Sequence, residues 1–192
     1  MHRVLPLLAC SILLSASLAG CSAVDSLIAK AKAPPAPAPP AAKVELRPTS
    51  GYQVTGIVDF SLSGDQVEVF AEVNGLPPNS IHGFHIHERG DCSAPDATSA
   101  GAHFNPGGAP HGAPDHGEHH AGDLPNLKAD GDGVAHLRFR TRALTIDNGP
   151  NGILGRAVIV HRDADDYASQ PAGNSGPRIA CGLIEPEVNT DD

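Results

Sequence analysis

Apolar and polar residues alternate in short runs through the middle of the chain, and turn residues separate the runs. The alternation covers 54–60 and resumes at 67–73, after a turn of Ser, Gly and Asp at 63–65. A period of two predicts strands with one buried face. Four further strands are expected, at 81–88, 133–140, 153–161 and 179–184. Because no window keeps a helical period, the pattern favours an antiparallel all-β sandwich or barrel.

The composition agrees with short strands joined by long loops. The chain of 192 residues contains 21 Gly and 18 Pro, more than a helical domain would tolerate. With five Phe, two Tyr and no Trp, the core must consist mainly of Val, Ile, Leu and Ala. The net charge of -9 argues against nucleic acid as a partner, because phosphate binding requires a basic surface.

The beginning of the chain resembles a bacterial lipoprotein signal. A mostly apolar run at 4–18 is too short for a comfortable membrane span. The run ends in LAGC at 18–21, which resembles the lipobox, where cleavage precedes a cysteine that receives lipid. We therefore expect cleavage before Cys21 and lipidation of its thiol. The alternative is ordinary signal cleavage, which would leave Cys21 as a spare thiol.

A Pro/Ala-rich segment at 33–42 follows, and it can bury almost no surface. Such a segment adopts polyproline II, and at about 3.1 Å per residue it would hold a domain roughly 30 Å from its anchor. The expected parts are a signal, a lipidated N-terminus with its linker, a folded domain and an acidic tail, at 1–20, 21–42, 43–187 and 188–192. We expect the protein on the periplasmic side of the bacterial cell envelope, and Ser22 favours the outer membrane.

Seven of the eleven histidines lie between Gly83 and Asp123. Imidazole is the commonest metal ligand in proteins, and a core seldom needs it in number, so the density indicates a metal site. His85 and His87 flank Ile86 in a predicted strand, which places both imidazoles on one face and Ile86 toward the core. Taken alone, such a pair is weak evidence for a metal.

A second group of possible ligands lies in a Gly/Pro-rich loop rather than on a strand. Its members, separated by eight, nine and three residues, are His103, His111, His120 and Asp123. Three imidazoles and a carboxylate suit a closed tetrahedral zinc site, and metal binding would give the loop a reason to be ordered. The alternative is a disordered His-rich loop that scavenges metal, in which the spacing would not matter.

Five short pieces of the chain occur in the order typical of one protein family. They read GFHIH at 83–87, GAHFNP at 101–106, HAGDL at 120–124, VH at 160–161 and GPRIACG at 176–182. Together they resemble the copper/zinc superoxide dismutase family over about residues 44–185, and the short interval from His87 to Cys92 resembles its bacterial secreted branch. The resemblance implies an antiparallel Greek-key β-sandwich or barrel of about eight strands, with long metal-binding and active-site loops.

By position in these pieces, the resemblance implies two metal sites. Copper would be held by His85, His87, His103 and His161. Zinc would be held by His103, His111, His120 and Asp123. His103 would bridge both metals as an imidazolate when copper is oxidised, since its two nitrogens can each bind a metal.

The resemblance also implies roles for residues outside the two ligand sets. Asp165 would accept hydrogen bonds from one copper-ligand and one zinc-ligand imidazole, and Arg178 would pair with the incoming anion. Cys92 and Cys181 would form a disulfide, which a secreted chain makes plausible. His82 is expected to make a structural hydrogen bond. The positions of three further histidines match no ligand of the family: His116, His119 and His136.

The activity that the resemblance implies is dismutation of two superoxide anions and two protons to dioxygen and hydrogen peroxide, without an organic cofactor. His103 would leave copper on reduction and could then deliver a proton. The loop at 167–177 contains no Lys, so we expect other cations, such as Arg89 or Lys128, to help Arg178 steer the anion. The alternative is an envelope lipoprotein of this fold that binds copper or zinc without catalysis. The sequence leaves monomer and homodimer open.

Overall fold

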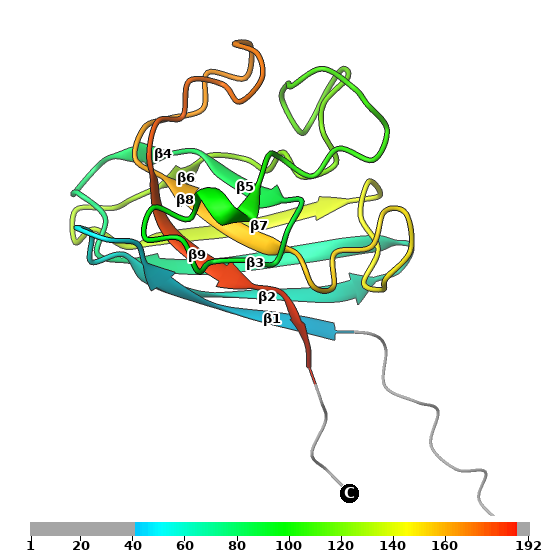
Figure 1. Cartoon of the computed structure of the whole chain (residues 1–192), viewed down its shortest axis with the longest axis horizontal. Coiled ribbons are helices and arrows are strands. Elements are labelled where there is room, and N and C mark those ends of the chain that lie inside the picture. Colours follow the sequence, from blue (N-terminus) through cyan, green and yellow to red (C-terminus); the bar gives the residue numbers. More distant parts are fainter. Residues whose placement is uncertain (1–40, 188–192) are drawn as a thin grey trace, which may run out of the picture. The chain divides into compact units, whose positions relative to one another are not determined.

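Strands make up nearly all the regular structure of residues 41–187, the part of the chain that the computed structural model describes (Figure 1). They are, in chain order, β1 (Ala41–Pro48), β2 (Thr55–Ser63), β3 (Gln66–Asn74), β4 (Ile81–His82), β5 (Phe84–His87), β6 (Leu127–Lys128), β7 (Ala135–Thr141), β8 (Ala157–His161), β9 (Arg178–Leu183) and β10 (Glu185–Pro186). Within these residues the only helix is a 3-10 turn, η1 (Thr98–Ala100). It is too short to cross a membrane. The predicted signal, Cys21, most of the linker and the acidic tail lie outside the described residues.

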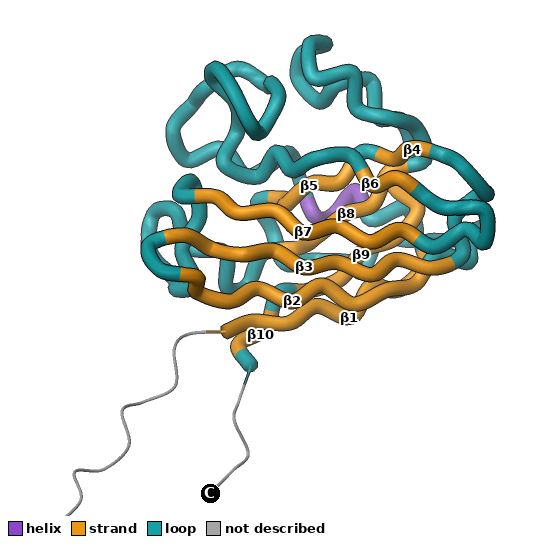
Figure 2. Tube along the Cα trace, turned by 180° about the vertical axis from the view of Figure 1, so that it is seen from behind, coloured by secondary structure: helices purple, strands orange, loops and turns teal. Residues whose placement is uncertain are grey.

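The longer strands form one curled antiparallel sheet in the order β5-β8-β9-β1-β2-β3-β7. β1 joins its two parts, because Arg47 and Pro48 at its end pair with β9 while most of its length pairs with β2. Figure 2 shows β7, β3, β2 and β1 side by side as one layer of the fold. Between β3 and β7 the chain crosses to β5 at the opposite edge of the sheet and returns, which is a Greek-key connection. The predicted antiparallel all-β architecture is confirmed.

Alternate residues of β2 and β3 build the core between the two layers. Val58 lies opposite Ala71 and Phe60 lies opposite Val69, and all four side chains are buried. A period of two sends these side chains to the same face and the intervening polar ones outward. Burial of each large apolar side chain contributes about 1.5–3 kcal/mol. The alternation predicted for both segments is therefore confirmed.

The strand predicted at 81–88 is instead two strands, β4 and β5, separated by Gly83. The chain changes partner there, since Ile81 pairs with Lys128 of β6 whereas Phe84 pairs with Val160 of β8. A side chain at Gly83 would place its Cβ 2.7 Å from the Cβ of Ser175, so glycine allows the loop after β8 to approach. Alternation does not reveal a change of partner, because the period of two continues across it.

β1 and β8 also begin at positions that the sequence pattern did not predict. β1 begins at Ala41, inside the segment expected to be linker, because Ala42 is fully buried and pairs with Phe60. β8 begins at Ala157, later than predicted, because Gly155 adopts a positive φ of 74° and the residues before it form a turn. Both differences lie outside the segments that carry the histidines.

β5 and β8 are buried along their whole length, because loops cover the face that points away from the core. On the core side lie Phe84 and Ile86 of β5. The loop at 92–101 contains η1, and we call it the η1 loop. On the covered side of β8, Ala157 and Ile159 form a small apolar cluster with Ala97 and Ala100 of this loop and with Cys181. The loop that follows β5 is thus packed against the sheet through Ala97 and Ala100.

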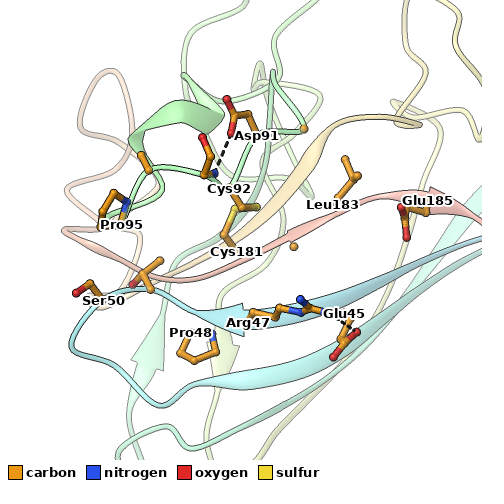
Figure 3. A pocket seen from close by; sticks show the side chains of 15 residues that line it. Glu45, Arg47, Pro48, Ser50, Asp91, Cys92, Pro95, Cys181, Leu183 and Glu185 are labelled. Carbon is orange, nitrogen blue, oxygen red and sulfur yellow. Dashed lines mark hydrogen bonds and ion pairs between the residues drawn. A yellow bond between two sulfur atoms is a disulfide. The ribbon is translucent and has the colours of Figure 1, made fainter.

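A disulfide ties the η1 loop to the sheet. Cys92, soon after β5, is bonded to Cys181 of β9, 89 residues further along the chain (Figure 3). The bond lies beside a surface groove lined by the loop at 90–95 and by residues of β1 and β9. The disulfide expected from the family resemblance is therefore present, and it fixes the start of the η1 loop beside β9.

Removing this disulfide should lower the stability of the domain substantially. In the chain-entropy model, opening a loop of this length costs about 4–5 kcal/mol. The variant in which both Cys92→Ser and Cys181→Ser are made should lose about that much free energy of unfolding, measured by urea denaturation of the metal-free protein. Ser93→Ala, a neighbouring change that leaves the bond intact, serves as the control. A loss below about 1 kcal/mol in the double variant would contradict the prediction.

Candidate metal centre

The candidate metal centre begins on the loop-covered face of β5. His85 and His87 point to this face and are fully buried, while Ile86 between them lies in the core. The end of β8 brings His161 beside them, and an isolated bridge pairs His87 with His103 of the following loop. The placement of His85 and His87 on one face follows from strand geometry.

Three backbone hydrogen bonds hold the central segments of the site together. The amide of Phe104 donates to the carbonyl of Ile86, that of Gly122 to Phe104, and that of Ile86 to Gly122, each at 2.8 Å. Each of these residues is a sequence neighbour of at least one candidate ligand. A Cβ on Gly122 would collide with the Ile86 carbonyl, so only glycine permits this ring of contacts. We call these three residues the backbone ring.

The first ligand group brings four imidazoles together. Its ligand atoms lie within 4.8 Å of one another and come from His85, His87, His103 and His161. The Nδ1 atoms of His87 and His161 donate to the carbonyls of Gly101, at 2.9 Å, and Gly176, at 3.1 Å. Their Nε2 atoms lie 3.4 Å apart, facing each other. Each imidazole thus has one nitrogen fixed by the protein and one directed toward its neighbours, as metal ligands require.

Buried nitrogens without partners mark the centre of the site. His85 Nδ1, His103 Nε2 and His111 Nδ1 are buried and make no hydrogen bond among the described residues. Buried polar atoms are nearly always paired, so three unpaired nitrogens at one place require an explanation. Metal ions would use these lone pairs. His85 and His103 belong to the first ligand group, whose four imidazoles suit copper, whereas His111 Nδ1 lies beside Asp123 in a second group. The residues present therefore fit a metal.

The second ligand group surrounds one carboxylate oxygen. It consists of His103, His111, His120 and Asp123. Asp123 Oδ1 lies 2.8 Å from His103 Nδ1, 3.1 Å from His111 Nδ1 and 3.3 Å from His120 Nδ1. Asp123 Oδ2 accepts backbone N–H groups of His120, at 2.9 Å, and Gly112, at 3.2 Å, which fix the carboxylate. Three imidazoles and one carboxylate oxygen in this arrangement fit a closed zinc site.

The electrostatics favour the metal-binding protonation states of the first ligand group and of Asp123, but not of His111. Burial tends to lower the pKa of His111, but its hydrogen bonds with Asp123 and Asp165 outweigh burial and raise it to about 9. Burial lowers the pKa of His85 to about 4 and holds the pKa of His87 and His161 well below the ordinary value, because a charged imidazole loses its hydration there. Burial tends to raise the pKa of Asp123, but its three imidazole neighbours outweigh burial and hold it far below its usual range. Neutral imidazoles and an ionised carboxylate are the forms that coordinate metals.

Asp165 connects the two ligand groups from behind. Its Oδ2 accepts from His85 Nε2 at 2.8 Å, and its Oδ1 accepts from His111 Nε2 at 2.9 Å. The backbone amide of Tyr167 donates to the same Oδ1. The Asn126 side chain donates to the backbone carbonyl of Asp165 and accepts from its backbone N–H. Burial raises the pKa of Asp165, but the hydrogen bonds from both imidazoles lower it further than burial raises it. This carboxylate fixes which nitrogen of each ring faces the centre.

A cavity of about 810 Å³ opens onto the first ligand group. His87, His103 and His161 lie at its wall, and Arg178 is the only Lys or Arg among the residues that line it. Arg178 donates to two carbonyls of the η1 loop, from Nη1 to Ala97 at 2.5 Å and from Nη2 to Gly101 at 2.6 Å. Both bonds hold the guanidinium at the edge of the cavity.

The other cations considered from the sequence do not line this cavity. Arg89 pairs with Glu88 at 3.3 Å, and Lys128 lies on β6, which pairs with β4 in a separate two-stranded sheet. Arg162 pairs with Asp163 at 2.8 Å. The expected help from Arg89 or Lys128 therefore finds no support in the positions of these side chains.

The remaining histidines lie outside both ligand groups. His82 is buried and donates from Nδ1 to the carbonyl of His161 at 2.8 Å, while its Nε2 contacts Ser80 Oγ at 2.6 Å. These bonds give His82 a structural position behind a candidate ligand. The others contact carboxylates or the backbone on the surface or near it: His116, His119 and His136.

Sequence patterns gave no indication of Arg156, which supports the backbone ring. Its guanidinium carbon lies 3.5 Å from the centroid of the Phe104 ring. Its Nε donates to Gly152 at 2.6 Å and its Nη1 donates to the carbonyl of Glu88 at 3.0 Å. A cation over an aromatic face stabilises by about 0.5–2 kcal/mol. No local motif marks the residue, because Phe104 and Glu88 are far from it in sequence.

Comparison with known proteins agrees with this geometry. Residues 54–184 match the family described as copper/zinc superoxide dismutase (SODC). The superoxide dismutase (Cu-Zn) 2 of Aquifex aeolicus is 41% identical over 147 residues, which cover 74% of this chain and 85% of that protein. The superoxide dismutase (Cu-Zn) of Deinococcus radiodurans is 42% identical over 159 residues, or 76% of this chain and 85% of the relative.

Solved structures share the fold as well. A double mutant of a SOD-like protein from Bacillus subtilis superposes with a TM-score of 0.67 at 39% identity, over 74% of this chain and 96% of that chain. The clock protein EA4 gives a TM-score of 0.69 at 37% identity, over 77% and 94% of the two chains. The segment that matches the family contains both ligand groups, so fold, site and sequence agree. The chain therefore belongs to the copper/zinc superoxide dismutase family, whose cofactors are copper and zinc.

Proposed function

We propose that this superoxide dismutase acts in the bacterial envelope and that its two ligand groups bind different metals. The copper ligands in this proposal are His85, His87, His103 and His161, and the zinc ligands are His103, His111, His120 and Asp123. One observation carries the assignment: two buried groups share His103, which offers Nδ1 to one group and an unpaired Nε2 to the other. Three of the four imidazoles of the first group line the cavity, whereas the carboxylate and His111 of the second group do not.

Bound copper supplies one-electron oxidation and reduction of superoxide, giving dioxygen and hydrogen peroxide, and zinc fixes the shared imidazole. The protein supplies a place for a proton at His103 Nε2, which is unpaired, while its Nδ1 stays directed to Asp123. Since His103 lines the cavity, a proton on that atom is within reach of a small anion in it. Asp165 keeps His85 and His111 in place throughout, because it binds the nitrogens that face away from the centre.

Arg178 is proposed to attract and orient the substrate anion. Its guanidinium remains charged at all relevant pH values and is fixed at the cavity by two backbone carbonyls. A fixed cation in a cavity raises the local concentration of a small anion, and salt screens the effect. The chain carries a net charge of -9, so a local positive charge is needed at the entrance.

Dismutase activity of the purified, metal-loaded protein tests the main proposal. His161→Ala should reduce the rate by at least about a hundredfold, since even loss of a partner that only orients a metal ligand costs ten- to a hundredfold. His136→Ala, an exposed histidine on β7, should leave the rate unchanged. The assay is superoxide decay after pulse radiolysis, with copper and zinc measured in the same samples. Full metal loading without dismutation would favour the alternative, an envelope lipoprotein that binds copper or zinc without catalysis.

The proposed role of Arg178 predicts a salt-dependent rate. The rate of the native protein should fall as ionic strength rises, and Arg178→Gln should be slower by about tenfold at low salt with a flatter salt profile. Arg178→Lys keeps a charge but lacks the planar pair of nitrogens that bonds the two carbonyls, so it separates charge from geometry. Arg140→Gln on β7 is the matched control. A flat or rising salt profile in the native protein would contradict this role.

The envelope location rests on the N-terminal sequence. We propose that cleavage before Cys21 and lipidation of its thiol anchor the protein on the periplasmic side, with Ser22 directing it to the outer membrane. A single acyl chain binds membranes only marginally, so stable anchoring requires the full lipoprotein modification. The Pro/Ala-rich segment at 33–42 would then act as a spacer.

The anchor can be tested by fractionating cells that express the full chain. The native protein should sediment with membranes and incorporate labelled palmitate. Cys21→Ala should be found in the soluble fraction without label, whereas Cys10→Ala, within the apolar run, should behave like the native protein. Equal membrane association of the native chain and Cys21→Ala would show that Cys21 is no anchor.

A further inference from the structure

Gln170 joins two loops that are far apart in the sequence. It belongs to the loop at 162–177, after β8, and its side-chain amide pairs with the backbone of His111 in the Gly/Pro-rich loop. The backbone N–H of His111 donates to Gln170 Oε1 at 2.8 Å, and Gln170 Nε2 donates to the carbonyl of His111 at 2.9 Å. One amide side chain thus satisfies both backbone groups of a single residue, as a neighbouring strand would.

The backbone of His111 has little other support. Within residues 41–187 no backbone–backbone hydrogen bond outside the regular strands involves His111, and His111 belongs to no strand. The segment around it reads GGAPHGAP, in which the glycines allow many backbone conformations and the prolines lack an N–H donor. An unpaired backbone group beside a buried side chain is costly, so the pairing with Gln170 has structural weight.

The same loop also holds the His111 ring. Asp165 accepts from Nε2 of that ring at 2.9 Å, which leaves Nδ1 directed toward Asp123. The loop at 162–177 therefore bonds His111 at two places. Asp165 bonds the His111 ring and Gln170 bonds the His111 backbone. Gln170 and the two residues after it, Pro171 and Ala172, line the cavity that opens onto the first ligand group.

We propose that Gln170 is a positioning residue that sets the backbone of His111 and thereby couples zinc binding to the loop that walls the substrate cavity. The inference rests on the proposed role of His111 as a zinc ligand. Zinc at the second ligand group fixes His111, and through the paired amide His111 fixes the cavity wall at Gln170 and Pro171. In return, the paired amide holds His111 in place before zinc binds, so less conformational entropy is lost on binding.

Two substitutions separate the parts of this contact. Gln170→Glu keeps the size and can still accept from the His111 N–H, but it cannot donate to the His111 carbonyl. Gln170→Ala removes both bonds. Since Gln170 is exposed, neither change should disturb the core. Gln53→Glu makes the same chemical change at another exposed glutamine, whose side chain forms no hydrogen bond among the described residues, and it serves as the control.

The first measurement is zinc affinity of the metal-free protein, by competition with a coloured chelator. Both Gln170 variants should bind zinc about tenfold more weakly than the native protein, while their copper affinity stays within about twofold. With Co(II) in place of zinc, the visible spectrum of the variants should shift, because the geometry at His111 changes. Unchanged zinc affinity and an unchanged cobalt spectrum would overturn the proposal.

The second measurement is hydrogen exchange of the amides at 166–176, with and without zinc alone. Zinc should slow exchange of this loop in the native protein and in Gln53→Glu, and should slow it at least about threefold less in Gln170→Glu. Equal zinc-dependent protection in native protein and variant would overturn the coupling. If the native protein binds no zinc at these residues, the zinc assignment itself fails, and this inference fails with it.

Discussion

The site depends first on the ring of three backbone hydrogen bonds among Ile86, Phe104 and Gly122. These bonds use only backbone atoms. The side chains next to them in the sequence therefore remain free to point toward the centre of the site. The ring fixes the spacing between the strand histidines and the loop that bears His103 and Asp123 through backbone atoms alone. Arg156 adds a cation on the Phe104 face from outside and so restricts the ring further.

Burying six imidazoles costs folding free energy, because their nitrogens lose hydrogen bonds to water. Hydrogen bonds within the protein reduce this cost at the nitrogens that face away from the centre of the site. Backbone carbonyls accept from His87 and His161, and one buried carboxylate accepts from His85 and His111. His85 Nδ1 and His103 Nε2 gain no such partners, and a metal ion could use their lone pairs. Metal binding at these residues would add to the folding free energy.

The sequence was sufficient for the features that depend on local geometry. Alternation predicted the buried faces of β2 and β3, and it placed His85 and His87 opposite Ile86 because adjacent strand residues point in opposite directions. It did not show the change of partner at Gly83, which depends on β6 and β8 rather than on local residues. The roles of Arg156 and Gln170 were equally invisible, since their partners lie in distant loops and no motif surrounds them. The family resemblance supplied Asp165 and the disulfide, which periodicity alone could not.

The disulfide and the cavity are connected through one carbonyl. The η1 loop starts at Cys92, which is bonded to β9, and ends at Gly101, whose carbonyl accepts from both His87 Nδ1 and Arg178 Nη2. That oxygen therefore sets the distance between a ring of the first ligand group and the cation at the cavity. Because Arg178 and Cys181 lie on the same strand, the loop is fixed to β9 at both of its ends, by a covalent bond at one and by hydrogen bonds at the other.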